Sequence, residues 1–222
     1  MAVACKSSNP PGLDCTELDL YRFFAFVFAS PSRERFETLA LPQLKDALHA
    51  LWLKLGCRRN FPDFVCFNAY EDYEATYIAL FDVGMPEPPV PLFESGHDKT
   101  RPAQEIALEN TWFHDALGLK WDSSCAVPDY LITQLEFLAA VRYTLENTPD
   151  ASSKQNLAHL EADFLQRHML NWVRRANTKL NHASTSLFGT LMNLLAAFLQ
   201  NRLAEVQSPS STATARTPPP LD

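Results

Sequence analysis

Residues 70–97 read YEDYEATYIALFDVGMPEPPVPLFESGH, and this stretch decides the fold. Its first half places large side chains near one face at helical spacing, which predicts a helix over roughly residues 68–82. Residues 85–92 are rich in proline, and proline removes the amide donor that a regular helix requires. The stretch therefore predicts an aromatic-bearing helix followed by an irregular connection.

Helical periodicity also precedes this stretch. Residues 14–29 carry apolar side chains at helical spacing, with Asp14 as the expected N-cap. Ser30-Pro31 predicts a new start, with a capping residue and then proline at the first helical position. A further apolar face ends at Gly56, a typical residue after a helix. The N-terminal part of the chain is thus predicted to be helical.

The same pattern continues to the C-terminal region. We expect one helix from Pro102 to Gly118, and Pro128 is expected to open another with a packing face of Leu131, Leu135, Leu138 and Tyr143. A long amphipathic helix follows the capping-box pattern Ser152-x-x-Gln155. Residues 187–203 are apolar almost all round, which predicts a central buried helix.

The fold class predicted by these patterns is all-α. We expect a single compact helical bundle domain over residues 13–207, a flexible leader over 1–12, and a disordered Ser/Thr/Pro-rich tail over 208–222. The chain has 6 glycines against 16 prolines, whereas an all-β fold usually needs many glycine-bearing turns.

Composition narrows the class of partner. The formal net charge of -7 argues against nucleic-acid binding, which needs concentrated Lys and Arg. The N-terminus lacks the apolar core of a signal peptide, and the longest apolar run, residues 23–29, is too short to span a bilayer. The 5 cysteines stand singly, as expected for free thiols. We therefore expect a cytoplasmic protein without stable membrane insertion.

The patterns that mark enzymes are missing from the sequence. There is no phosphate-binding glycine loop, no Gly-x-Ser-x-Gly elbow and no His-x-x-x-His pair. Carboxylates cluster at Glu71-Asp72-x-Glu74, but on a helix such clusters usually form a solvated face. His168 and Trp172 are four residues apart and could stack on one helix. We expect a binding protein with no catalytic residue, metal or cofactor of its own.

Four motifs in consistent order resemble the TorD/DmsD/NarJ family of redox enzyme maturation chaperones. The first is the opening stretch, with Leu-Phe at a helix end and then glycine, prolines and an acidic-Ser element. The others are WFHDALGL at 112–119, PDYLITQLEFL at 128–138 and FLQRHMLNW at 164–172. This resemblance implies an all-helical chaperone domain.

The resemblance also implies a partner and a site. Members bind the twin-arginine signal peptide and apo-form of a molybdopterin oxidoreductase of the DMSO reductase superfamily, assisting cofactor insertion and delaying export. Positions that match the family's peptide-binding residues are Tyr77, Leu80, Phe81, Pro91, Pro128, Asp129 and Tyr130. We add Phe93, Glu94 and Ser95 because they adjoin the proline loop.

One position departs from the family pattern. Where the family has Glu-Pro-Asp-His, this chain has Val127-Pro128-Asp129-Tyr130. Tyrosine can stack and donate a hydrogen bond, but it does not titrate near neutral pH as histidine does. A role that depends on that histidine is therefore not transferred to Tyr130.

Two other functions stay open from the sequence alone. One is a permanent structural or assembly subunit of a redox enzyme complex, and the other is a nucleotide or metal hydrolase without recognisable motifs. The identity of the client enzyme is not encoded in the motifs. Both a monomer and a dimer are compatible with the sequence, since the long connection from Gly84 to Arg101 would permit domain swapping.

Overall fold

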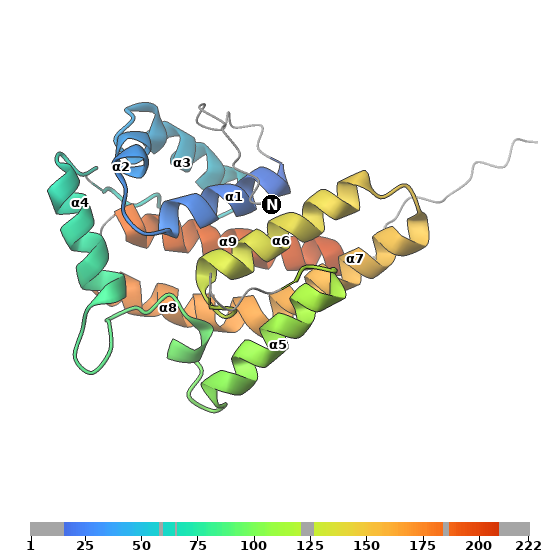
Figure 1. Ribbon diagram of the computed structural model, residues 1–222. Helices are drawn as coiled ribbons and strands as arrows, with labels where there is room; N and C mark the ends of the chain where they lie inside the picture. The colour runs from blue at the N-terminus through green and yellow to red at the C-terminus, as the bar shows by residue number, and fades with distance from the viewer. Residues whose placement is uncertain (1–15, 58–59, 65, 121–126, 184–186, 209–222) are drawn as a thin grey trace, which may run out of the picture.

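The computed structural model describes residues 16–57, 60–64, 66–120, 127–183 and 187–208, and it confirms the all-α prediction (Figure 1). Within these residues the only β-type pairing is one isolated bridge. The elements are α1 Glu17–Phe28, α2 Arg33–Leu39, α3 Gln43–Lys54, α4 Tyr70–Tyr77, η1 Ile78–Asp82, η2 Glu94–Gly96, α5 Ala103–Ala116, α6 Leu131–Asn147, α7 Ala151–Phe164, η3 Leu165–Met169, α8 Leu170–Ala183 and α9 Leu187–Gln207.

The helices form a bundle around α6, α8 and α9. The π-helical turn η3 joins α7 to α8 without a break, so these elements form one long helix along the molecule (Figure 1). α1 packs along α6, and α9 returns beside α8. α2, α3 and α4 cover one end of the bundle, whereas α5 lies at its outer edge (Figure 1). This arrangement leaves one side of α5 without a neighbouring helix.

The predicted central helix is confirmed in α9, which buries residues along most of its length. Phe188 at its start is fully buried, and its ring centroid lies 5.9 Å from Tyr73, 5.9 Å from Tyr77 and 5.2 Å from Phe81. Aromatic pairs at such distances add to the stability gained by burial. The helix predicted over residues 68–82 therefore uses its aromatic face to anchor α4 and η1 onto α9.

A buried ion pair joins α7 to α9. Arg202 donates from Nε and Nη2 to the two carboxylate oxygens of Glu161, at 2.7 and 2.8 Å. The Tyr21 hydroxyl of α1 donates to the same carboxylate at 3.0 Å. Burial, followed by the Glu161 charge, raises the pKa of Tyr21. This cluster ties three helices that are far apart in the sequence.

α6 begins at Leu131 and not at the predicted Pro128, which lies in the turn before the helix. Two further predicted helix starts are wrong. The cap of α2 is Ser32, whose hydroxyl accepts from the Arg35 amide at 3.2 Å, so Ser30-Pro31 lies before the helix. The cap of α7 is Asp150, whose carboxylate accepts from Ser153 N at 2.7 Å, so Ser152-x-x-Gln155 lies inside the helix. In both cases a different residue close by is the N-cap. Ser and Asp side chains can each accept a hydrogen bond from the backbone amide three residues later, so several residues could have capped these helices.

Other predicted boundaries have mixed outcomes. Gly56 and Gly118 end their helices with φ of 64° and 76°, a left-handed conformation that favours glycine, so these stops are confirmed. Tyr143 does not belong to the packing face of α6, since 55% of it is exposed. α1 begins after Thr16, which forms a capping box with Asp19.

Some predictions concern the two ends of the chain. Asp14, the leader over 1–12 and all but the first residue of the predicted tail lie outside the described residues. The division into leader, domain and tail thus stays a prediction. Cys57 and Cys66 are free thiols, and burial raises the pKa of each. No helix in the described part of the chain is long and apolar enough to cross a membrane.

Candidate functional site

Residues 90–97, hereafter the crossing segment, run between η1 and the start of α6. On one side, Val90 N donates to Leu80 O of η1 at 3.0 Å. On the other side, Leu131 N at the start of α6 donates to Leu92 O at 2.9 Å. The structure thus brings together the helix end, the proline loop and the 128–130 turn, whose role in peptide binding stays a prediction.

The 128–130 turn holds the crossing segment through both backbone and side chain. Glu94 N donates to Asp129 O at 2.9 Å, and Ser95 N donates to the Asp129 carboxylate at 3.0 Å. Phe93 and Tyr130 form the isolated antiparallel bridge. Only 3% of Asp129 is exposed, so its carboxylate orients the backbone of the crossing segment.

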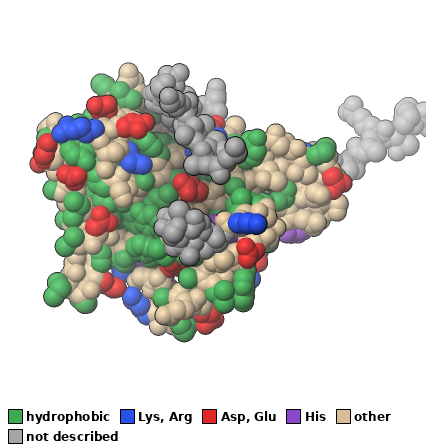
Figure 2. All heavy atoms as spheres, viewed as in Figure 1, with side chains coloured by type: hydrophobic (Ala, Val, Ile, Leu, Met, Phe, Trp, Pro, Cys, Tyr) green, Lys and Arg blue, Asp and Glu red, His purple; other side chains and the backbone are tan. Residues whose placement is uncertain are grey.

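Phe93 and Tyr130 form the accessible part of this region. Their ring centroids lie 5.0 Å apart at an interplanar angle of 32°, and both side chains are half-buried. Pro128 and Ser95 are also partly exposed. Figure 2 shows apolar side chains gathered between α4 and the start of α6. We refer to Phe93, Ser95, Pro128 and Tyr130 as the ring platform.

The remaining predicted apolar site residues lie beneath this platform. Tyr77, Leu80, Phe81 and Pro91 are all buried. The Tyr77 hydroxyl donates to Phe28 O at 2.8 Å. Burial raises the pKa of Tyr77, and burial also raises the pKa of Tyr130. These four residues are part of the core and do not reach solvent in this conformation.

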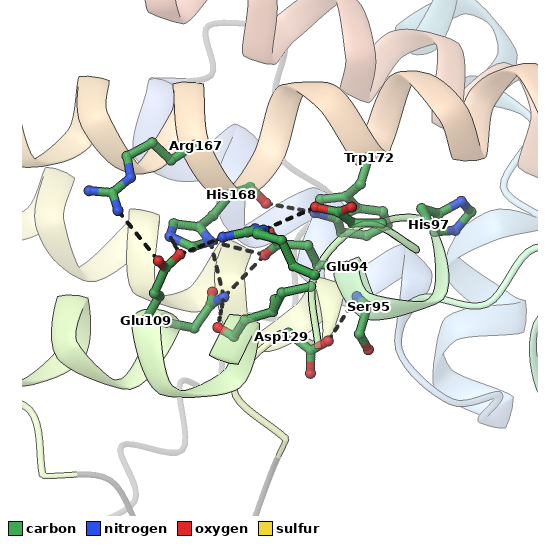
Figure 3. Close-up of polar contacts among 12 residues, drawn as sticks. Glu94, Ser95, His97, Glu109, Asp129, Arg167, His168 and Trp172 are labelled. Atoms are coloured by element: carbon green, nitrogen blue, oxygen red, sulfur yellow. Dashed lines mark hydrogen bonds and ion pairs between the residues drawn. The ribbon is translucent and has the colours of Figure 1, made fainter. Parts of the chain in front are cut away.

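Glu94 is the centre of a buried polar network (Figure 3). Only 2% of Glu94 is exposed, and its carboxylate accepts hydrogen bonds from Gln134 Nε2 at 2.9 Å, Asn110 Nδ2 at 3.1 Å and Arg101 Nη2 at 3.1 Å. His168 Nδ1 lies 3.1 Å from the carboxylate. Because a buried carboxylate must be compensated by donors, these four partners explain how Glu94 is tolerated there.

The network extends from helix to helix. Gln134 Nε2 also donates to Asn110 Oδ1 at 3.0 Å, and Trp172 Nε1 donates to Gln134 Oε1 at 3.1 Å. The other Asn110 amide hydrogen is taken by Ile106 O at 2.9 Å, so His168 Nδ1 faces Glu94 as a donor. The crossing segment is thereby fastened to α5, α6 and α8.

The opposite edge of His168 faces a second carboxylate. Its Nε2 lies 3.6 Å from Glu109 Oε2 and has no hydrogen-bond partner among the described residues. Glu109 is paired with Arg101 at 2.7 Å and with Arg167 at 3.7 Å (Figure 3). Arg101 also bonds Asp98 at 3.1 Å. In this cluster Arg101 and Arg167 compensate the charges of Glu109 and Asp98. These ion pairs stabilise the contact between α5, η3 and the residues just before α5.

His97 closes the crossing segment, and it corrects the predicted pairing of Trp172. The Trp172 ring stacks on His97, with centroids 5.5 Å apart at 27°, whereas His168 lies against Phe113 at 5.2 Å. His97 Nε2 lies 2.7 Å from Pro91 O. Burial lowers the pKa of His97 to about 4, so the ring is neutral at pH 7.

Asp82, the last residue of η1, is an exposed carboxylate beside the ring platform. Burial is the main cause of the raised pKa of Tyr77 and of Tyr130, and the charge of Asp82 makes a smaller contribution to each. Among the described residues it takes part in none of the ion pairs. Sequence reasoning missed Asp82, although its place directly after Leu80-Phe81 was a usable signal.

Sequence reasoning also missed the partners of Glu94. Asn110 and Gln134 are polar residues at positions where the helical spacing of the neighbouring apolar residues predicts a buried side chain. A polar side chain at such a position requires a buried partner, and that was the available signal. Within the described residues, no group of three or more His, Cys, Asp and Glu side chains is arranged to hold a metal ion.

The fold is an all-helical bundle with one buried connecting segment, and comparison with known proteins specifies the family. The family model described as nitrate reductase delta subunit matches residues 40–178. The chain therefore belongs to the nitrate reductase delta subunit family, which confirms the resemblance to the TorD/DmsD/NarJ group.

Three curated relatives are named as assembly chaperones. The perchlorate reductase assembly chaperone of Dechloromonas aromatica is 27% identical over 62% of this chain and 63% of its own length. The chlorate reductase assembly chaperone of Ideonella dechloratans is 28% identical over 61% of this chain and 72% of its own. The selenate reductase assembly chaperone of Thauera selenatis is 26% identical over 61% and 72%. The match thus spans under two thirds of the first relative.

Proposed function

We propose that this chain is a non-enzymatic assembly chaperone for a molybdopterin oxidoreductase, and that it binds the twin-arginine leader of the apo catalytic subunit. Family membership supports the chaperone role, because all three relatives are named for the assembly of a reductase. Perchlorate, chlorate and selenate are all oxyanions. The proposed client is accordingly an oxyanion reductase.

The observation that carries the leader-binding part is the ring platform. A twin-arginine leader offers two guanidinium groups followed by an apolar stretch, so its site needs exposed apolar surface beside a free carboxylate. Phe93 and Tyr130 supply a rigid aromatic surface. Arginine stacks on aromatic faces and pairs strongly with carboxylates. Tyr130 offers this stacking surface at the position where the family has histidine.

The carboxylates predicted from the sequence have different roles in this proposal. Glu94 and Asp129 are buried and already bonded, so they position the platform from below. Asp82 is exposed, and we assign it the contact with an arginine of the leader. Leader binding would hold the apo-subunit in the cytoplasm until its cofactor is inserted, and release would then allow export.

The test is binding of a synthetic peptide that carries two adjacent arginines followed by an apolar stretch, measured by calorimetry with the full chain. We expect Tyr130→Ala and Phe93→Ala each to weaken binding about tenfold, because each removes part of an aromatic contact. Asp82→Asn should weaken it about fivefold, since it removes one partly exposed charge pair. A peptide with two glutamines in place of the arginines should bind no better to wild type than to Asp82→Asn.

The control variant is Tyr143→Ala, which removes an aromatic ring that is 55% exposed on α6. Equal affinity of wild type, Tyr130→Ala and Asp82→Asn would remove the platform as the leader site. Failure of every twin-arginine peptide to bind would refute leader binding itself. Co-purification in fixed ratio with the mature, cofactor-loaded reductase would instead favour a permanent subunit, since a chaperone must leave before export.

A further inference from the structure

The outer face of α5 carries a regular stripe of exposed residues. Glu105, Leu108, Trp112 and Asp115 follow one another at spacings of three, four and three, so they lie on one side of the helix. The exposed fraction is 50% for Leu108 and 58% for Trp112, and both acids are exposed. The stripe is about 15 Å long at the rise of an α-helix.

This stripe faces away from the bundle. The opposite side of α5 packs inward through Ile106, Asn110, Phe113 and His114, which are all buried. Figure 1 shows α5 at the outer edge of the molecule, and Figure 2 shows apolar side chains over α5 with acidic ones at their borders. A large exposed Trp beside a Leu is unusual on a surface that has no partner.

The charges at the two ends of the stripe are uncompensated. α5 contains three acids and neither Lys nor Arg. Glu109, on the flank, is already paired with two arginines. Glu105 and Asp115 form no ion pair with any described residue. The stripe therefore presents acid, apolar, apolar, acid, and its complement is basic, apolar, apolar, basic.

The pattern opposes in-register pairing of two copies of α5. The spacing of the four stripe residues, three, four and three, is the same in both chain directions. A second copy of α5 aligned with the first would therefore place its acids against Glu105 and Asp115 in both the parallel and the antiparallel arrangement. Two like charges in contact oppose association. A twin-arginine leader is also a poor complement, because adjacent arginines cannot supply charge at both ends of a stripe about 15 Å long.

We propose that the Glu105–Leu108–Trp112–Asp115 stripe of α5 docks a basic amphipathic helix in the mature part of the client's apo catalytic subunit. Leu108 and Trp112 bury the apolar face of that helix, and Glu105 and Asp115 pair with Lys or Arg at its two ends. Recognition of this kind pairs the apolar faces of two amphipathic helices, through residues three and four apart. The client identity rests on the proposed function, whereas the chemistry of the docked helix rests on α5 alone.

The first experiment uses a synthetic helical peptide of about 18 residues, long enough to form a helix on binding. It carries Lys, Leu, Leu and Lys at spacings of three, four and three, and its twin carries Glu in place of both lysines. We expect the full chain to bind the Lys peptide and to bind the Glu peptide at least tenfold more weakly. In a Glu105→Lys/Asp115→Lys variant this preference should reverse.

Side-chain truncation measures the apolar part. Leu108→Ala/Trp112→Ala should weaken Lys-peptide binding more than tenfold with an unchanged unfolding midpoint, because both side chains are largely exposed. Leu53→Ala on α3 is the matched control, since Leu53 is 66% exposed. Equal binding of the Lys and Glu peptides, or an equal loss in the Leu53→Ala variant, would overturn the proposal. The proposal would also be overturned if wild type sedimented as a dimer and the Leu108→Ala/Trp112→Ala variant sedimented as a monomer.

A second experiment separates this site from the leader site. The apo catalytic subunit of the proposed client reductase, produced without its leader, should bind wild type and lose at least tenfold in affinity for Leu108→Ala/Trp112→Ala. The arginine peptide should bind both forms equally. If that peptide fails to bind while the leaderless subunit binds through α5, leader binding fails and the docking stripe stands. If the leaderless subunit binds both forms equally, the docking stripe fails alone.

Discussion

Removing the Glu94 carboxylate should destabilise the fold strongly. Glu94→Ala deletes the acceptor of three hydrogen bonds, from Gln134, Asn110 and Arg101, and leaves His168 Nδ1 without its carboxylate. Arg101 can turn to Glu109, to which it is already bonded at 2.7 Å, so its loss is small. Gln134 and Asn110 each keep one other acceptor, but one amide hydrogen of each and His168 Nδ1 stay buried without a partner.

The expected cost follows from the number of orphaned donors. Removing one member of a buried charged network costs about 3–5 kcal/mol, most of it from groups that stay buried without a partner. For a domain of this size each kcal/mol lowers the unfolding midpoint by about 2–4 °C, so we expect a fall of about 10 °C. Glu94→Gln keeps the volume but turns one acceptor into a donor, and it should cost about 2 kcal/mol.

Urea unfolding followed by far-UV circular dichroism measures the free energy of unfolding of each variant. The dependence of this free energy on urea concentration should be the same in all variants. Glu37→Ala is the matched control, because Glu37 is an exposed carboxylate on α2 and its loss should change stability by less than about 0.5 kcal/mol. A loss below about 1 kcal/mol for Glu94→Ala would show that the network does not hold the crossing segment.

Three further changes test separate parts of the fold by the same unfolding assay. The pKa of His97 is about 4 in the folded chain and about 6.5 in the unfolded chain, so the unfolded chain gains a proton first as the pH falls. The free energy of unfolding should therefore drop by up to about 3 kcal/mol between pH 7 and pH 4. The His97→Gln variant should lose less over the same range. Gly96→Ala should cost about 1–3 kcal/mol, because a Cβ would lie 2.6 Å from Pro91 Cγ; no loss would mean that the loop can shift freely. Arg202→Met should cost about 3–5 kcal/mol by leaving Glu161 buried and unpaired, and Arg202→Met/Glu161→Leu should recover part of it.

Much of the fold was predictable because it depends on local pattern. The aromatic face of residues 68–82, the stops at Gly56 and Gly118, and the burial of α9 all follow from side chains three or four apart. The errors at Ser30 and Ser152 arose where several capping residues stand close together, and tertiary contacts chose among them. Tyr143 was placed inward by its spacing, but it lies on a side of α6 that leaves 55% of it exposed.

The candidate site was predictable only in part. The three segments that meet at the crossing segment were found through the family resemblance, and Phe93 and Tyr130 do lie together. Which acids are buried could not be read from the sequence, because Glu94 meets His168, a residue 74 positions away. Periodicity carries no information on such pairs. The exposure of Asp82 and of Trp112 likewise depends on how the helices are arranged.

The cluster of Tyr21, Glu161 and Arg202 has a consequence for how the chain is made. Tyr21 is bonded to a residue 140 positions later. At a synthesis rate of about 5–20 residues per second, the apolar face of α1 waits on the order of ten to thirty seconds for its partners to leave the ribosome. The N-terminal helix therefore cannot complete its packing until α7 and α9 have been synthesised, and until then this chain exposes the same kind of surface that we propose it shields in its client.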